Sequence, residues 1–433
     1  MAGRYKAYSE YKDSGVSWLE KVPSHWDITK TAWHFVAEKG KNGQVLTNEY
    51  IGQNNGDYPV YSGQTGNNGV MGCIDTYEFD TGKEGVLFST TVGAKAMTLN
   101  HLKGKFSLSQ NCLIIQKTSP IFNTRFCFYH FQPLFSFERG LIPEHMQASF
   151  RMEDLYQYKI ALPSFEEQQK IANFLDFETA KIDTLISKQE KLIELLKEKR
   201  QAVISHAVTK GLNPNAPMRD SGVEWLGEVP EYWELKKFKY LFKIRKRIAG
   251  KTGLDILSIT KKGIKVKDIS SGEGQLSMDY SKYQLVNAGD FAMNHMDLLT
   301  GFVDISKYNG VTSPDYRVFT LEHKYSDSDY YLRVLQMGYL DKVFYPLGQG
   351  AANIGRWRLP TEAFNEFLAP CPPYKEQEQI SSFINKTHDK IDALLEKAES
   401  AINLMKERKI GLISAAVTGK VDVRDWQPQG IQG

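Results

Sequence analysis

The sequence has little cysteine, little net charge and no long apolar run. Its cysteines, Cys73, Cys112, Cys127 and Cys371, stand far apart in a chain of 433 residues. Zinc sites need closely spaced ligand pairs and disulfide scaffolds need many cysteines, so both classes are excluded. No segment approaches the roughly 18 apolar residues of a membrane span, and the N-terminus lacks the apolar core of a signal peptide. These absences predict a cytoplasmic protein with free cysteines and no metal site.

Positive and negative charges nearly cancel, with 54 Lys and Arg against 51 Asp and Glu, which leaves a net charge of +3. This balance excludes a histone-like polycation. It does not exclude a nucleic-acid partner, because phosphate binding depends on where the charge is placed. A hydrophobic content of 41% describes a globular protein, and the length predicts two or three domains.

Two parts of the sequence occur twice. Residues 13–26 (DSGVSWLEKVPSHW) return as residues 220–233 (DSGVEWLGEVPEYW), and we call these the framing segments. The runs EEQQKI, KIDTL and ISHAVTK within 166–210 return as KEQEQI, KIDAL and ISAAVTG within 375–419. Both pairs recur at nearly the same shift, so the chain consists of two half-chains of one plan. Each half has a framing segment, a variable body and a charged helix.

The charged helices have the pattern of a coiled coil. Residues 166–208 contain no Gly or Pro, and Ser164 with Glu167 fits a capping box. Apolar residues at alternating three- and four-residue steps predict a seam in each helix, with Gln189, Lys199, Thr387 and Arg408 as its polar members. We expect the two helices, each roughly 65 Å long, to pair with each other; the alternative is pairing with another chain. The predicted apolar seam is Leu175, Ile182, Leu185, Leu192, Leu196 and Val203, then Ile384, Ile391, Leu394, Ala398, Ala401, Met405 and Leu412.

The bodies are rich in Gly, aromatic and β-branched residues. Strand-like runs such as Gly85–Ser89, Leu113–Gln116 and Tyr316–Leu321 alternate with turn clusters, which predicts mixed α/β domains. The predicted boundaries are a first framing region at 1–27, a first body at 28–162, a helix at 163–210, a linker with the second framing region at 211–234, a second body at 235–371, a C-terminal helix at 372–420 and a flexible tail at 421–433.

Three segments partly match catalytic motifs. The CPPY sequence at 371–374 has a cysteine where amino-methyltransferases need an amide or carboxylate oxygen. Gly250–Thr252 lacks the upstream glycine of a phosphate loop. A nuclease-like Pro-Asp at 314–315 is separated from Glu322 by a predicted strand, which would place the two carboxylates about 23 Å apart. We therefore predict no catalytic residue.

A basic stretch at 236–251 (KKFKYLFKIRKRIAGK) contains eight cations and no acid. Cations interleaved with aromatic residues suit an element that faces phosphates, although a solvated lysine face has the same pattern. Asn and Gln can bind adenine bidentately, but they are also ordinary turn residues. The predicted DNA contacts are Lys30, Gln64, Asn67, Asn68, Lys95, Lys105, Lys237, Lys239, Arg245, Lys246, Arg247, Lys251, Lys261, Lys262, Asn294 and His295.

The duplicated framing segments and helices resemble those of the specificity subunits of type I restriction–modification systems. The stretches NNGDYPVYSGQTG (54–66), NAGDFAMN (287–294) and GVTSPDYRVF (310–319) are similar to target-recognition domains of that family. The resemblance covers nearly the whole chain. It implies two target-recognition domains separated by two long antiparallel helices, with pseudo-two-fold internal symmetry.

The resemblance also implies a non-enzymatic DNA-binding subunit. Each body would bind one half of a bipartite target, and the helices would set the spacer between the halves. Two methyltransferase subunits and also restriction subunits would bind the helices and the framing residues Trp18 and Trp225. S-adenosylmethionine, ATP and Mg²⁺ would belong to those partners, so this chain is expected to bind no cofactor. The alternatives are a self-sufficient DNA methyltransferase or nuclease, and a coiled-coil scaffold without a DNA role.

Overall fold

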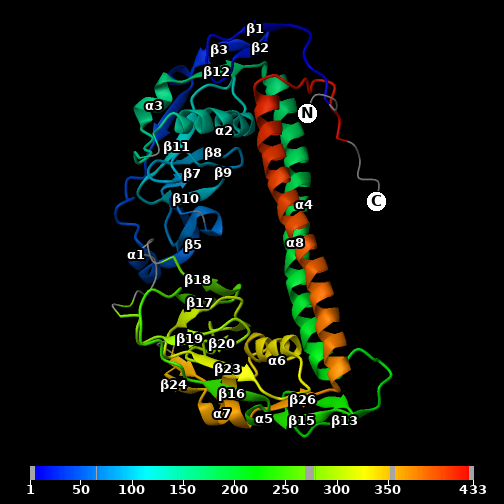
Figure 1. The fold of residues 1–433 in the computed structure, drawn as a ribbon. Helices are drawn as coiled ribbons and strands as arrows, with labels where there is room; N and C mark the ends of the chain where they lie inside the picture. Colours follow the sequence, from blue (N-terminus) through cyan, green and yellow to red (C-terminus); the bar gives the residue numbers. More distant parts are fainter. Residues whose placement is uncertain are drawn as a thin grey trace. The chain divides into compact units, whose positions relative to one another are not determined.

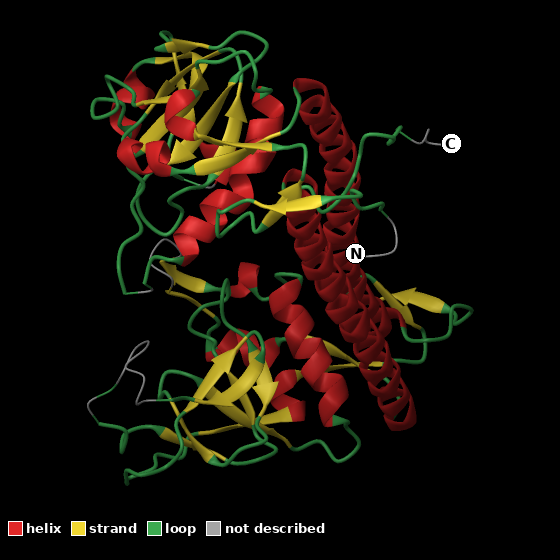
Figure 2. Cartoon of the chain, turned by 90° about the horizontal axis from the view of Figure 1, so that it is seen from above, coloured by secondary structure: helices red, strands yellow, loops and turns green. Residues whose placement is uncertain are grey.

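The computed structural model describes residues 5–64, 66–143, 145–268, 277, 279–351 and 356–428. The chain divides into unit 1 (Met1–Gln189 and Ser400–Gly433) and unit 2 (Glu190–Glu399). Each unit holds one framing segment, one body and part of both long helices, α4 (Phe165–Lys210) and α8 (Tyr374–Val417). The predicted mixed α/β fold is confirmed (Figures 1 and 2). Within the described part of the chain, no helix is long and apolar enough to cross a membrane.

The body of unit 1 is centred on an antiparallel sheet with the strand order β4-β11-β8-β9. Its inner strand β8 (VLFST) is buried throughout, and α2 supplies fully buried Phe126 and Phe131 to the same core. A second sheet has the order β6-β5-β10-β7. These elements are β4 (Phe35–Glu38), α1 (Asn48–Gln53), β5 (Asn55–Tyr61), β6 (Val70–Ile74), β7 (Phe79–Asp80), β8 (Val86–Thr90), β9 (Leu99–Leu102), β10 (Lys105–Leu108), β11 (Cys112–Lys117), α2 (Thr124–Gly140) and α3 (Met152–Gln157).

The body of unit 2 repeats the topology of the first sheet. Its antiparallel sheet has the order β16-β23-β20-β21, so in both sheets the strand that comes last along the chain pairs between the first and the second. The two bodies therefore share one scaffold, although their sequences barely align. The elements are α5 (Phe238–Leu241), β16 (Phe242–Arg245), β17 (Leu257–Thr260), β18 (Gly263–Val266), β19 (Gln284–Val286), β20 (Phe291–Met293), β21 (Val303–Ile305), β22 (Gly310–Thr312), β23 (Arg317–Leu321), α6 (Ser328–Leu340), β24 (Gln349–Ala351), β25 (Arg356–Arg358) and α7 (Thr361–Glu366).

Each framing segment forms a short hairpin and then a strand that pairs with the end of its own body. The hairpins are β1-β2 and β13-β14, and the later pairs are β3-β12 and β15-β26. The strands are β1 (Tyr11–Asp13), β2 (Lys21–Pro23), β3 (Asp27–Lys30), β12 (Lys159–Leu162), β13 (Met218–Asp220), β14 (Glu228–Pro230), β15 (Glu234–Lys237) and β26 (Leu368–Cys371). The repeated sequence thus folds twice into the same local structure.

The two long helices pair antiparallel in each unit. In unit 1, Lys409 of α8 binds Asp183 of α4 through Nζ at 2.7 Å. In unit 2, Arg200 of α4 binds Asp392 of α8. Lys409 and Asp392 are the repeat counterparts of Arg200 and Asp183, so the same interhelical ion pair is made twice.

The predicted seam needs a correction at three positions. Leu175, Ile182, Leu196, Ile384, Ile391 and Leu412 are buried, and Val203 and Met405 are partly buried. Leu185, Leu192 and Leu394 are 50%, 42% and 48% exposed, so they lie outside the buried seam between the helices, and their role as subunit contacts stays a prediction. The following residues, Ile186, Ile193 and Leu395, are partly buried instead. From Ile182 and from Ile391 the seam therefore continues four residues further along the helix, whereas the prediction placed its next member three residues further.

The C-terminal segment that follows α8 packs against unit 1. Val421 and Val423 are buried, and the Trp426 ring lies 5.4 Å from the ring of Phe174 on α4. The backbone N–H of Asp422 donates to Lys6 O at 2.8 Å. The prediction of a flexible tail is therefore wrong for residues 421–428, because this segment carries apolar side chains that cover α4. Residues 429–433 lie outside the described residues.

Candidate nucleic-acid interface

The framing segments are anchored by a glutamate at the start of each long helix. In unit 1, the indole N–H of Trp26 donates to Glu167 at 3.0 Å, and the Tyr8 hydroxyl donates to the same carboxylate at 2.6 Å. In unit 2, the indole N–H of Trp233 donates to Glu376 at 3.2 Å. Ser164 accepts a hydrogen bond from the Glu167 N–H, which is one half of the predicted capping box. The Glu167 side chain binds Trp26 instead of the backbone at the start of the helix, so the other half is not formed.

The glutamine that follows each of these glutamates holds the start of a second helix, α2 in unit 1 and α6 in unit 2. Gln168 and Gln377 are fully buried, and each accepts a backbone N–H, from Asn123 at the start of α2 and from Asp327 at the start of α6. Their amides donate to carbonyl oxygens of the residues before α4 and α8, at 2.9 and 2.8 Å. The repeated Glu-Gln pair therefore ties three elements of each unit together, which explains its place in the repeat.

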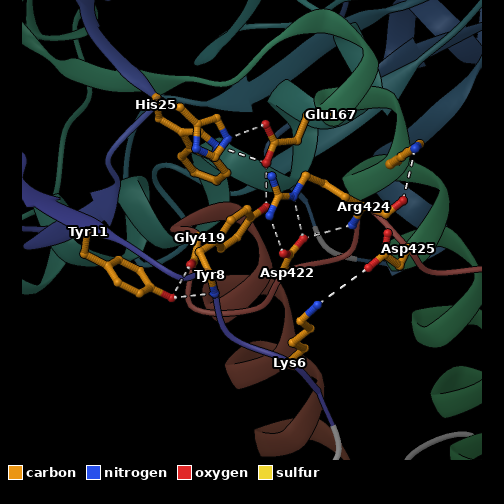
Figure 3. A network of polar contacts seen from close by, with 11 residues as sticks. Lys6, Tyr8, Tyr11, His25, Glu167, Gly419, Asp422, Arg424 and Asp425 are labelled. Carbon is orange, nitrogen blue, oxygen red and sulfur yellow. Dashed lines mark hydrogen bonds and ion pairs between the residues drawn. The ribbon is translucent and has the colours of Figure 1, made fainter.

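Figure 3 shows how the two ends of the chain meet in unit 1 around Glu167. Arg424 forms a bidentate pair with Asp422 and lies over the ring of Tyr8 at 4.9 Å. Arg424 holds the pKa of Asp422 below its usual range by hydrogen bonding. Burial, and then the bond to Glu167, raises the pKa of Tyr8. This network connects the segment before β1 to the segment that follows α8.

Trp18 and Trp225, predicted as partner contacts, are partly buried against their own units. The indole N–H of Trp18 donates to Lys159 O at 3.1 Å. The Trp225 ring stacks on Phe367 with 5.2 Å between centroids, and it lines a groove of about 780 Å³ that also includes Leu347. One face of Trp225 therefore remains beside an open groove.

Much of the basic stretch in unit 2 is neutralised by acids from distant parts of the sequence. Lys237 and Lys239 both bind Glu366, and their hydrogen bonds lower its pKa to about 2. Arg245 binds Glu322 and Arg247 binds Asp290. These four cations are predicted DNA contacts, and the structure places them in ion pairs within unit 2. Because a paired cation offers less attraction to phosphate, they are weaker candidates than an unpaired lysine.

Three other cations of the stretch are exposed and make no ion pair among the described residues: Lys243, Lys246 and Lys251. The backbone around Lys251 is fixed, because the N–H groups of Ala249 and Gly250 donate to Tyr283 O and Ser281 O. Two of the predicted contacts, Lys246 and Lys251, thus flank a segment that runs along Tyr283.

Tyr283 belongs to the wall of a hollow of about 900 Å³ in unit 2. Two further tyrosines, Tyr280 and Tyr316, line it, and the rings of Tyr280 and Tyr283 meet edge to face at 4.9 Å. The predicted contact Asn294 also lines it, and its Oδ1 has no hydrogen-bond partner among the described residues. Aromatic faces stack on bases, and an amide can bind adenine, so this tyrosine hollow is the best candidate for reading a base in unit 2.

His295 and the lysines 261 and 262 lie elsewhere in unit 2. His295 does not line the tyrosine hollow; burial, helped by nearby Arg317 and Arg358, lowers its pKa to about 3. It is therefore neutral at physiological pH and offers no positive charge to a phosphate. Lys261 and Lys262 line a separate cavity beside α4 and α6.

Unit 1 presents a smaller cluster around the predicted contact Lys105. Its ammonium lies 4.4 Å from the ring centroid of Tyr77, and the ring of Tyr58 meets that of Tyr77 at 5.0 Å. Lys105 is exposed and Tyr77 is 43% exposed. A cation beside two accessible aromatic faces suits a nucleic acid strand, because phosphate and base can be bound together.

The other predicted contacts of unit 1 have local roles or stand alone. The amides of Gln64 and Asn67 donate to Val70 O at 2.8 and 3.3 Å, and Asn67 and Asn68 adopt φ angles of 48° and 53°. Asparagine tolerates this left-handed backbone better than most residues, so the turn interpretation explains these residues. Lys30 on β3 and Lys95 are exposed and make no ion pair among the described residues.

Sequence reasoning missed the tyrosines at 58, 77, 280, 283 and 316. The available signal was tyrosine beside polar and glycine residues, as in NNGDYPVY at 54–61. It also missed a polar cavity of about 550 Å³ in unit 1, lined by Lys103, His101 and Arg125. In the part of the chain that the structure describes, no group of His, Cys, Asp or Glu has the geometry of a metal site.

Comparison with known proteins agrees with this arrangement. Residues 36–195 match the family model of the type I restriction modification DNA specificity domain. A Mycoplasma pneumoniae protein named "putative type I specificity subunit" is 32% identical over 164 residues, which are 37% of this chain and 41% of that protein, so the match spans less than half of either. The MjaVIII type I restriction enzyme specificity subunit of Methanocaldococcus jannaschii is 24% identical over 94% of this chain and 95% of that protein.

Two solved structures share the fold. A chain from a type I restriction–modification system, studied for its assembly and conformational transition, superposes with a TM-score of 0.65 at 10% identity and covers 92% of this chain and 98% of that one. The HsdS subunit of Thermoanaerobacter tengcongensis gives a TM-score of 0.51 with the same identity and coverage. With the matched domain, the relative that is similar over nearly its full length and the shared fold, the chain is similar to specificity subunits of type I restriction–modification systems, and its residues 36–195 match their DNA specificity domain.

Proposed function

We propose that the chain recognises a bipartite DNA target, with the body of unit 1 on one half-site and the body of unit 2 on the other. The observation that carries this proposal is the duplication itself. Both units have the same sheet order and the same Glu-Gln anchors. Their candidate contacts differ, with Lys105 and Tyr77 in one and the tyrosine hollow in the other. One scaffold with two different surfaces is suited to two different half-sites.

In this proposal the paired helices set the length of the unspecified spacer. With 46 and 44 residues, α4 and α8 are each roughly 65–70 Å long. This length corresponds to about two turns of DNA at ~34 Å each. Half-sites one to two turns apart would therefore match the helices.

The proposed partners are two methyltransferase subunits, joined by restriction subunits. Two identical partners need a surface that occurs twice, and the framing segments and helices are the parts of this chain that repeat. The exposed leucines 185, 192 and 394 and the groove beside Trp225 are apolar surfaces that such partners could cover. S-adenosylmethionine, ATP and Mg²⁺ would act in those subunits, where the target adenine is flipped out of the duplex for methylation.

A paired insertion in the helices tests the spacer proposal. One heptad is inserted between Gln189 and Glu190 and a second between Glu399 and Ser400, so that both helices lengthen where the two units divide. Seven residues add about 10 Å, or about three base pairs at ~3.4 Å each. Methylome mapping of cells that express the variant with its methyltransferase should show unchanged half-sites and a spacer longer by about three base pairs.

The control variant is Lys188→Ala, at an exposed helix position, which should leave the methylated sequence unchanged. A change of half-site bases in the insertion variant would contradict the role of the helices in setting the spacer. Absence of any methylated motif with the unmodified chain would contradict DNA recognition itself.

A further inference from the structure

A second cavity in unit 2 is strongly basic. It measures about 430 Å³ and lies among α4, α6, α8 and the turn between β17 and β18. Five cationic side chains line it together with one histidine: Lys197, Arg200, Lys261, Lys262, Arg333 and His388. Among the lining residues that the structure describes, Asp304 is the one acid. Its Oδ2 is already occupied by the backbone N–H of Ile264 at 3.0 Å.

The innermost cation of this cavity has no carboxylate partner. Arg333 donates to the neutral oxygens of Gln336 at 2.9 Å and Asn385 at 2.7 Å, and no ion pair of Arg333 is found within the described residues. Burial lowers its pKa, although Asp329 and Asp304 act in the opposite direction. A partly buried cation without an anion is costly, because neutral partners do not replace the lost hydration fully.

Three nitrogen atoms in the same cluster also lack hydrogen-bond partners in the described part of the chain. They are Nε of Arg200, Nε of Arg333 and Nε2 of His388. Burial lowers the pKa of His388 to about 4, and the two arginines push it in the same direction, more strongly than Asp392 and Asp389 oppose it. Arg200 is paired with Asp392, whereas the other four cations make no ion pair among the described residues, so positive charge exceeds negative charge around the cavity.

The repeat supplies a direct comparison for this cluster. Counted from the helix N-caps Asn123 and Asp327, Arg333 of α6 corresponds to Tyr129 of α2. His388 corresponds to Thr179 by the shift of the long helices. In unit 1 these counterparts bind each other at 3.2 Å, and Tyr129 also donates to Asp176 at 2.7 Å. Unit 1 thus satisfies this position with its own side chains, whereas unit 2 places two basic side chains there.

We propose that this cavity of unit 2 binds a phosphate group. Arg333 supplies the fixed charge from α6, Arg200 of α4 adds its unpartnered Nε beside its ion pair with Asp392, and Lys261 and Lys262 line the cavity from the exposed turn. Guanidinium groups suit phosphate because their donors match its oxygens. At ~30 Å³ per water molecule, the volume holds a hydrated tetrahedral anion with room to spare. The phosphate can come from a DNA backbone or from a free phosphate compound, and only the DNA source rests on the proposed function.

Inorganic phosphate is the first probe. The full chain is titrated by calorimetry and by thermal denaturation against sodium phosphate, with sodium chloride at equal ionic strength as the reference. Phosphate should raise the melting temperature where chloride does not. Arg333→Tyr with His388→Thr copies the unit 1 residues and should weaken phosphate binding at least about tenfold, as loss of a charge-assisted bond predicts. Lys261→Gln with Lys262→Gln removes two exposed cations and should weaken it without affecting the fold.

The matched control is Lys409→Gln in unit 1, at the position that corresponds to Arg200. It should leave phosphate binding unchanged. NMR titration of His388 gives a second readout, because a bound anion should raise its pKa. The proposal is overturned if the unmodified chain shows no phosphate response beyond that of chloride, or if the exposed-lysine variant and the unit 1 copy both keep full affinity.

Duplex DNA of varied sequence distinguishes the two sources. If a DNA phosphate occupies the cavity, inorganic phosphate competes with DNA, and the lysine variant reduces the salt dependence of DNA binding by about one to two counterions. If a free phosphate compound occupies it, the variants lose the phosphate response while DNA binding is unchanged. Failure of the unmodified chain to bind any DNA would count against the proposed function and would leave the phosphate titration as an independent result.

Discussion

Replacement of Gln377 by alanine should destabilise unit 2 strongly, because its side chain joins three elements. The amide accepts the Asp327 N–H at 2.9 Å and donates to Pro372 O at 2.8 Å and, more weakly, to Tyr325 O at 3.4 Å. The side chain is fully buried, so water cannot replace these bonds. Each buried group left unpaired costs about 1–3 kcal/mol, so the two shorter bonds give a loss of about 2–6 kcal/mol.

Gln379→Ala is the matched control, two residues further along α8 and exposed. Thermal denaturation should show unit 2 of Gln377→Ala melting on the order of 10 °C lower, and the control should change little. Hydrogen exchange of the Asp327 amide adds a local readout, since this N–H loses its acceptor. Equal melting of the two variants, with the Asp327 amide still protected, would refute the assignment of Gln377 as the link between α6 and α8.

Lys246→Glu should weaken DNA binding and reduce its salt dependence by about one counterion in fluorescence anisotropy. Arg247→Glu should instead lower the stability of unit 2 by roughly 2–3 kcal/mol in thermal melts, because it leaves the buried carboxylate of Asp290 without its partner. Burial lowers the pKa of His130 to about 3, so its neutral form is favoured in the folded state. The stability that this residue contributes to the folded state is therefore fully present above the unfolded pKa of about 6.5. It is lost as the pH falls toward 3, by at most about 1.4 kcal/mol per pH unit. His130→Val, which copies Val334 of α6, should remove this slope when urea midpoints are compared at pH 7 and pH 5.

The repeat and the elements were accessible from the sequence because they depend on local patterns. The absence of Gly and Pro predicted the helix at 166–208, and the structure has it at Phe165–Lys210. The predicted strand at Leu113–Gln116 is β11 (Cys112–Lys117). The shared sheet order of the two bodies was not accessible, because it depends on pairing between strands whose sequences do not align.

The seam shows where a local pattern is insufficient. Leu185 is followed by Ile186, and Leu192 by Ile193, so two adjacent apolar residues satisfy the three-residue and the four-residue step equally well. Which residue of each pair is buried depends on where the partner helix packs, and the local sequence does not contain that information. Periodicity therefore predicts that a seam exists and leaves its phase open wherever apolar residues come in pairs.

The basic stretch shows the same limit for charge. A run of eight cations without an acid suggests an unneutralised surface, yet Lys239 meets Glu366 at 2.6 Å across 127 positions of sequence. Arg247 meets Asp290 in the same way. Net charge along a segment cannot show which acids fold against it, so only the structure separates Lys246 and Lys251 from their paired neighbours.

Because the chain contains two copies of one unit, corresponding positions can be compared to separate structural residues from functional ones. Where both copies keep the same contact, as Glu167 and Glu376 do with their tryptophans, the contact maintains the scaffold that they share. Where the copies differ but each satisfies its polar groups, the difference requires no ligand. The position shared by Tyr129 and Arg333 belongs to neither group. In unit 1 the Tyr129 hydroxyl is hydrogen-bonded, whereas in unit 2 the Nε atom of Arg333 has no partner among the described residues. Since a scaffold that tolerates tyrosine there has no structural need for an uncompensated arginine, that charge is better explained by an anion from outside the chain.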